Sequence, residues 1–84
     1  MPELSRFLGI VVAIYYRDHP PHFHVVYREF HATIAIRDGA IFGEFPARAL
    51  ASVEEWRILH KDELLLAWEL AQAGLPLRRI EPLE

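Results

Sequence analysis

In the first half of the chain, apolar residues form short runs or alternate with polar ones, as they do in β-strands. Segments of this kind are rich in Ile, Val, Phe, Tyr and Thr, and they cover residues 9–17, 22–28, 31–37 and 40–45. The residues between them favour turns: Asp18-His19-Pro20-Pro21, Glu29-Phe30 and Asp38-Gly39. The pattern predicts four strands that pair mainly antiparallel.

From Pro46 onward, Ala, Leu, Glu and Arg dominate, and apolar residues recur every three or four positions, which predicts helix. One helix from Pro46 to Ala73 would be about 42 Å long. Because a domain of this size has a radius of gyration of about 12 Å, we expect a break at residues 60–62. The predicted inward positions include both tryptophans: Ala49, Leu50, Val53, Trp56, His60, Leu64 or Leu65, Trp68 and Ala71.

The order of the elements, strands first and helices after, predicts the α+β class. We expect a single domain over residues 1–84, in which a four-stranded, mainly antiparallel sheet is packed on one face by two C-terminal helices. Gly74 suits the end of the second helix, and residues 77–84, with proline at position 82, are extended at best.

The composition narrows the function classes. The chain has 84 residues, no cysteine and a formal net charge of −3. Without cysteine there is no disulfide, thiolate nucleophile or iron–sulfur site, and a reducing, cytoplasmic location is expected. The longest apolar run is Ile10 to Tyr16, far short of the roughly 20 residues that span a bilayer, so no membrane partner is expected. The negative charge means that a nucleic-acid partner would have to meet a local basic patch.

The alternation within the central hairpin predicts two unlike sheet faces. With Glu29-Phe30 as the turn, one face carries four cross-strand pairs: Arg28–His31, Val26–Thr33, His24–Ala35 and His22–Arg37. The opposite face carries the core pairs: Tyr27–Ala32, Val25–Ile34 and Phe23–Ile36. We therefore expect a basic, histidine-bearing face opposite the helices.

Two readings of that face stay open. In the first, His22 or His24 is a general acid or base, and the face binds a phosphodiester through Arg17, Arg28, His31 and Arg37. Histidine titrates near neutral pH, and the arginine fork fits phosphate. In the second reading, which the residues alone favour, the face is only a solvated polar surface.

The spacing H-x-x-H-x-H of His19, His22 and His24 also raises the question of a metal. The spacing matches no standard zinc pattern, so no metal and no cofactor is predicted. Instead, Asp18, His19, Pro20 and Pro21 are expected to order the loop at the strand entrance.

Several motifs are similar to those of a small bacterial family known as domain of unknown function 4160. They lie along nearly the whole chain: Ser5-Arg6-Phe7-x-Gly9-Ile10, Tyr15-Tyr16-x-Asp18-His19-x-Pro21-His22-Phe23-His24, Tyr27, Pro46-x-Arg48-Ala49-Leu50, Trp56-x-x-Leu59-His60, Glu63-Leu64-Leu65-x-x-Trp68 and Ile80-Glu81-Pro82-Leu83. This chain has Val25 and Val26 where an alanine-like residue is frequent. The resemblance implies a small protein whose gene commonly neighbours another in toxin–antitoxin-like arrangements.

Together these observations predict a small component of a toxin–antitoxin-like pair that acts on RNA, or on a cognate protein encoded nearby, through its histidine and arginine face. The alternative is a non-catalytic protein-binding module, with a metal link left open, that docks a partner through its sheet face or an edge strand. Whether the protein is an enzyme, and whether it forms homo-oligomers, the sequence leaves open.

Overall fold

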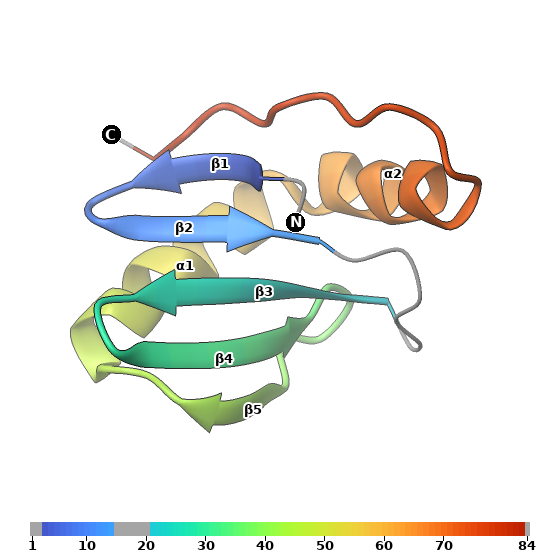
Figure 1. Ribbon diagram of the computed structural model, residues 1–84. Coiled ribbons are helices and arrows are strands. Elements are labelled where there is room, and N and C mark those ends of the chain that lie inside the picture. The colour runs from blue at the N-terminus through green and yellow to red at the C-terminus, as the bar shows by residue number, and fades with distance from the viewer. Residues whose placement is uncertain (1–2, 15–20, 84) are drawn as a thin grey trace.

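A computed structural model of the protein describes residues 3–14 and 21–83. Its sheet has five antiparallel strands that lie side by side in chain order (Figure 1). They are β1 (Glu3–Phe7), β2 (Ile10–Ala13), β3 (His22–Tyr27), β4 (Phe30–Ala35) and β5 (Ile41–Glu44). The α+β class and the antiparallel sheet are confirmed, whereas the predicted number of four strands was one too few.

The additional strand is β1, which pairs with β2 through a two-residue turn at Leu8-Gly9. Both turn residues have positive φ, +52° at Leu8 and +78° at Gly9, the conformation that tight hairpin turns require. The segment lacks clean alternation because the register shifts between Glu3 and Ser5, and both Leu4 and Ser5 are buried. A strand with such an irregularity does not show the regular alternation of apolar and polar residues from which strands are predicted.

Two helices follow the sheet, α1 (Ala47–Leu59) and α2 (Lys61–Gln72), and they lie on one side of it (Figure 1). The chain breaks at His60, as predicted, and α1 begins directly after Pro46. Trp56 is fully buried, and its ring lies 5.5 Å from that of Phe7 and 6.0 Å from that of Phe23. The rest of the helical contribution comes from a stripe of small and aliphatic residues: Val53, Leu64, Ala67 and Ala71. Trp68, expected in the core, is only partly buried.

The central hairpin turns one residue earlier than predicted. Arg28 and Glu29 form the turn, with Arg28 at φ +55°, and Tyr27 pairs with Phe30. The predicted pairs were therefore wrong: the partner of His31 is Val26, that of His24 is Thr33, and that of His22 is Ala35. The physical reason is Phe30, because the earlier turn makes it the first residue of β4, where its ring is half-buried instead of lying in the turn.

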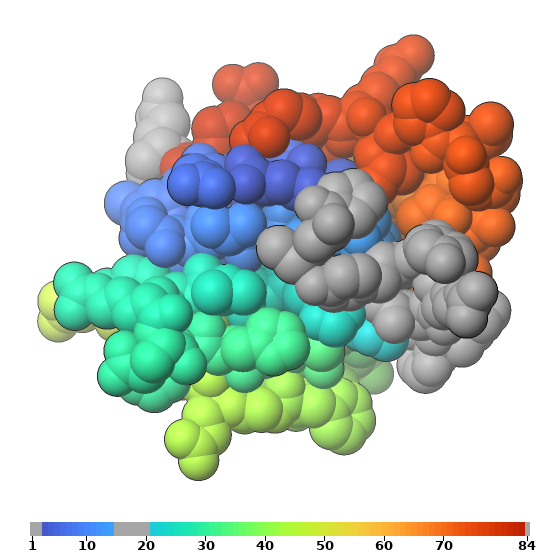
Figure 2. Space-filling model, in the orientation of Figure 1, coloured from blue at the N-terminus to red at the C-terminus, as the bar shows by residue number. Residues whose placement is uncertain are grey.

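The residues within the strands nevertheless keep their predicted faces, because every partner shifts by two positions and the alternation is preserved, whereas Arg28 and Arg37 lie in turns. Phe23, Val25, Ile34 and Ile36 are fully buried against the helices, as predicted. The histidines of the hairpin are on the opposite face, which we call the open face. Figure 2 shows this side of the sheet, with the side chains of β3 and β4 near its middle.

The C-terminal tail after α2 is extended, as predicted, and it also closes one edge of the sheet. The backbone N–H of Ile80 donates to the carbonyl of Leu4 at 2.8 Å, and the indole N–H of Trp56 donates to the carbonyl of Glu81 at 2.8 Å. The side chain of Ile80 is itself buried. The tail thus covers β1, along which it runs in Figure 1.

Candidate functional site

The open face is built from four strands of the meander, β2 to β5. His24 on β3 is paired with Ala13 on β2 and with Thr33 on β4, and Thr33 is paired with Phe42 on β5. The adjoining row contains Val11, Val26, His31 and Glu44. Directly opposite residues in an antiparallel sheet share a face, so these side chains lie together.

Two histidines meet on this face across the strands. The Nδ1 atom of His24 and the Nε2 atom of His31 are 3.3 Å apart, within hydrogen-bonding distance. Their rings are nearly parallel, at 11°, with centroids 5.4 Å apart. His31 is exposed and His24 is half-buried. The two residues are diagonal neighbours, a relationship that the observed register creates and the predicted register does not.

The hydrogen bond determines the chemistry of the remaining ring nitrogens. A neutral imidazole has one N–H and one lone pair, so one ring of the pair donates and the other accepts. Of the two remaining nitrogens, His24 Nε2 and His31 Nδ1, one must therefore bear a lone pair and the other an N–H. Whichever tautomer is present, the pair offers one proton acceptor and one proton donor.

His22 lies beside this pair, two residues before His24 on the same face of β3. Its ring centroid is 5.3 Å from that of His24, and the side chain is half-buried. The structure thus brings together both predicted catalytic histidines and adds His31, which was predicted to bind rather than to react.

The predicted arginines are less concentrated than expected. Arg28 is in the β3–β4 turn, where its guanidinium lies 5.2 Å from the ring centroid of Tyr27, a core-side residue. Arg37 is in the turn after β4. The two exposed arginines therefore flank β4 at opposite ends, about 20 Å apart for a strand of this length, rather than forming one clamp.

Arg17, Asp18, His19 and Pro20 lie outside the described residues, so their predicted roles stay predictions. Pro21, the last residue of the predicted loop motif, accepts a backbone hydrogen bond from Ile36 at 3.1 Å. Within residues 3–14 and 21–83, no group of three His, Asp or Glu side chains has the arrangement to hold a metal ion.

The sequence analysis did not identify Phe42 as part of the face. Its side chain is 73% exposed on β5, in the same cross-strand row as His24 and Thr33. An aromatic ring in water beside histidines is able to stack on a nucleobase or to contact another protein. The signal in the sequence was weak, because residues 40–45 form the last predicted strand but the apolar run Ile41-Phe42 does not show which side chain faces water.

A buried arginine that was also missed supports the end of β4. Arg57 on α1 bonds the carboxylate of Glu54 through Nε at 2.9 Å and through Nη2, and its Nη1 donates to the carbonyl of Ile36. The hydrogen bonding between Arg57 and Glu54 lowers the pKa of Glu54 and raises the pKa of Arg57. The interaction is structural, because it fixes the turn that follows the open face.

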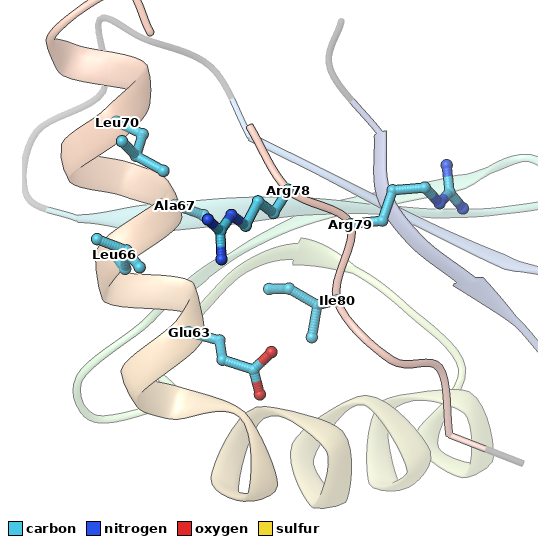
Figure 3. Close-up of a pocket in the computed structure, with 7 residues that line it drawn as sticks. All are labelled: Glu63, Leu66, Ala67, Leu70, Arg78, Arg79 and Ile80. Carbon is cyan, nitrogen blue, oxygen red and sulfur yellow. The ribbon is translucent and has the colours of Figure 1, made fainter. Parts of the chain in front are cut away.

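On the opposite side of the molecule, a hollow of about 290 Å³ lies between α2 and the tail (Figure 3). Leu66, Ala67, Leu70 and Ile80 form its apolar lining, with Glu63 at one end. Figure 3 shows Arg78 pointing toward α2 and Arg79 pointing away from it. Arg79 donates to the carboxylate of Glu3 at 2.9 Å. Glu63 is itself bonded to His60 at 2.6 Å, so this site has few polar groups left to orient a ligand.

The fold is thus a small α+β domain in which a five-stranded antiparallel meander exposes a histidine-bearing face. The chain belongs to the family described as domain of unknown function (DUF4160), which matches residues 9–69. This match covers more than half of the 84 residues and includes the whole open face from β2 to β5. Searches of curated proteins and of solved structures each found no match. No helix in the described part of the chain is long and apolar enough to cross a membrane.

Proposed function

We propose that the open face binds RNA and that His24 and His31 transfer protons in cleavage of its phosphodiester backbone. The observation that carries the proposal is the 3.3 Å contact between His24 Nδ1 and His31 Nε2 on an exposed sheet face. This pair lies on the sheet face opposite the helices, with His31 exposed to solvent.

The pair can supply both halves of general acid–base catalysis. The ring nitrogen with a lone pair takes the proton of the ribose 2′-hydroxyl, and that oxygen attacks phosphorus. The P–O bond to the 5′ oxygen then breaks, and this oxygen takes the proton from the ring nitrogen that carries N–H. Protons balance over the step, and the 2′-hydroxyl supplies the nucleophile, so neither a metal nor a cofactor is needed.

Other residues of the face suit a single strand of RNA. Phe42 provides a ring on which a base can stack, in the same cross-strand row as His24 and Thr33. Arg28 and Arg37 lie at the two ends of β4 with the histidines between them, so a strand that follows β4 would meet a cation at each end. We infer that the protein acts as the RNA-directed component of a toxin–antitoxin-like pair.

The test is cleavage of a single-stranded RNA by the wild type and by His24→Ala, His31→Ala and His22→Ala variants. We expect loss of cleavage, by at least about 100-fold, for the first two variants and a smaller loss for the third. RNA binding should persist in all three. His60→Ala is the matched control, because His60 bonds Glu63 at the helix junction, away from the open face.

Two results would remove the proposal: wild-type protein that does not bind RNA at low salt, or cleavage that survives replacement of both His24 and His31. Circular dichroism of each variant separates loss of chemistry from loss of fold. DNA of the same sequence should bind without being cleaved, since it lacks the 2′-hydroxyl.

A second candidate function, docking of a cognate protein, is favoured by an apolar patch at the β1–β2 turn. Leu8 is 58% exposed there and Leu59 is 65% exposed, and together with Leu83 they line one hollow of about 540 Å³. Glu55 is the acidic residue at this hollow, so an apolar segment with a basic residue would fit it. This patch is separate from the open face, and both functions can coexist.

A further inference from the structure

We propose that the protein forms a two-fold dimer in which β5 of one copy pairs antiparallel with β5 of a second copy, with the Phe42 residues facing each other at the axis. The proposal rests on the shape of β5 and does not depend on the RNA function.

The two edges of the sheet differ. The β1 edge is covered by the C-terminal tail through the hydrogen bond from Ile80 to Leu4. At the other edge, all residues of β5 are exposed, including Ile41 at 36% and Phe42 at 73%. Proteins usually protect a free edge by keeping it short, with charged side chains or proline, or with a covering segment. Ile41–Glu44 is short, but it contains no lysine or proline, and its one charged residue, Glu44, stands at its end.

The backbone of β5 has hydrogen-bonding groups available for a further strand. The carbonyl of Ala40 accepts from the N–H of Ala35 at 2.8 Å, so Ala40 points its backbone groups toward β4. Because this direction alternates along a strand, Phe42 and Glu44 also point toward β4, whereas Ile41 and Gly43 point outward. An added strand can therefore bond to Ile41 and Gly43 without disturbing the existing ladder.

A second copy of β5 satisfies these groups in one symmetric register. When the pair is centred on Phe42, Ile41 of each copy lies opposite Gly43 of the other. Each of these two residue pairs forms two backbone hydrogen bonds, which gives four in all. The two Phe42 rings then form a cross-strand aromatic pair on the open face. No two like charges oppose each other in this register, since Glu44 of each copy would lie opposite Ala40 of the other.

Gly43 makes this register specific. Its φ is +109°, and a Cβ there would lie 2.7 Å from the carbonyl oxygen of His31, so the position requires glycine. The strand consequently lacks a side chain at this point. In the proposed register, Ile41 of the second copy is the residue opposite, next to a hollow lined by Phe45, Pro46 and Leu50. Centring on Gly43 instead would set Phe42 against Glu44 and leave two glycines face to face.

The axis runs perpendicular to the sheet, so both open faces point the same way in one ten-stranded sheet. The helices of both copies remain on the opposite side, where they do not obstruct the contact. A four-residue edge buries less area than a permanent interface, so we expect a dissociation constant on the order of 100 µM.

The first test measures mass by sedimentation equilibrium of the full chain over a wide concentration range. The mass should rise from 9.8 kDa toward twice that value. Phe42→Lys should weaken the association at least about tenfold. Leu66→Lys, which changes an exposed leucine on α2, should have no effect. A constant 9.8 kDa for the wild type would overturn the proposal and would leave the edge to a different protein.

The second test fixes the register, and it uses the absence of cysteine from the chain. In the proposed dimer, Phe42→Cys places two thiols opposite each other with Cα atoms about 4.5 Å apart, which a disulfide can span. Ile41→Cys places them more than about 7 Å apart. The first variant should therefore oxidise to a dimer much faster than the second, and equal rates would refute the register.

Amide hydrogen exchange provides a readout that needs no substitution. The N–H groups of Ile41 and Gly43 should gain protection as the protein concentration rises, whereas those of Phe42 and Glu44 should be protected throughout. Protection of Ile41 and Gly43 that does not depend on concentration would contradict pairing with a second copy.

Discussion

Arg57 on α1 donates a hydrogen bond from Nη1 to the backbone carbonyl of Ile36, at 2.8 Å, and so ties the helix to the end of β4. The arginine is 6% exposed and also holds the carboxylate of Glu54. Gly39 packs directly against the pair, because a Cβ there would lie 3.0 Å from Nε of Arg57. One buried guanidinium thus positions the turn from which β5 starts.

Replacing this arginine should destabilise the protein. Arg57→Met keeps much of the apolar stem but leaves the carbonyl of Ile36 without its donor and Glu54 without its cation. We expect the free energy of unfolding to fall by about 2–3 kcal/mol, measured by urea denaturation. Arg48→Met, an exposed change on the same helix, should stay within about 0.5 kcal/mol of the wild type. Equal losses from the two changes would contradict a structural role for Arg57.

The same pair predicts a pH dependence of stability. The hydrogen bond from Arg57 lowers the pKa of Glu54 from its ordinary value of 4.5. Because the folded state has the lower pKa, the stabilisation is present above pH 4.5 and is lost as the pH falls through the folded pKa. Glu54→Gln should therefore reduce stability at pH 7 and flatten its decline below pH 4.5.

Glu3 acts in the same direction, since hydrogen bonds from Arg6 and Arg79 lower its pKa, so the decline will not vanish in the Glu54 variant. The matched control is Glu55→Gln, which removes an exposed carboxylate one residue away. If the stability of the Glu54 and Glu55 variants depended on pH in the same way, the ion pair between Glu54 and Arg57 would not be the source of the pH dependence.

The alternation of apolar residues was enough to predict the fold class, the core face of the hairpin and the helix break at His60. The central turn was misplaced because Arg28 has φ +55°, a conformation that propensities rarely assign to arginine. The role of the tail was not predictable, because it depends on two hydrogen bonds to distant residues, Leu4 and Trp56. The histidines were predicted to share a face, but the contact between His24 and His31 depends on register, and a shift of two positions decides it.

The positions of Arg28 and Arg37 predict how RNA binding responds to salt. Changing both to glutamine should weaken binding and reduce the slope of log K against log salt by about 1.4, since each phosphate contact on a single strand contributes about 0.7. The double variant Arg48→Gln with Arg78→Gln is the control, because it removes the same charge from α1 and from the tail. Fluorescence anisotropy at several salt concentrations gives both slopes, and identical slopes would mean that only net charge matters.

Leu8 provides a prediction in which stability and binding move in opposite directions. It has φ +52°, a conformation that costs about 1–2 kcal/mol for residues with a Cβ, and its side chain is 58% exposed. Asparagine tolerates this conformation, and an asparagine at position 8 followed by Gly9 would form a favoured hairpin turn. Leu8→Asn should therefore raise the free energy of unfolding by about 0.5–1 kcal/mol.

If the patch of Leu8, Leu59 and Leu83 docks the product of a neighbouring gene, the same variant should lose that complex when the two proteins are co-expressed and purified together. Leu59→Ser should lose it as well, whereas Leu66→Ser, on α2, should retain it. A variant that is more stable than the wild type yet no longer binds cannot owe the loss to unfolding, so the loss would locate the contact at the turn. Retention of the complex by Leu8→Asn would remove the patch as the docking surface, because the substitution replaces an exposed leucine at its centre with a polar amide.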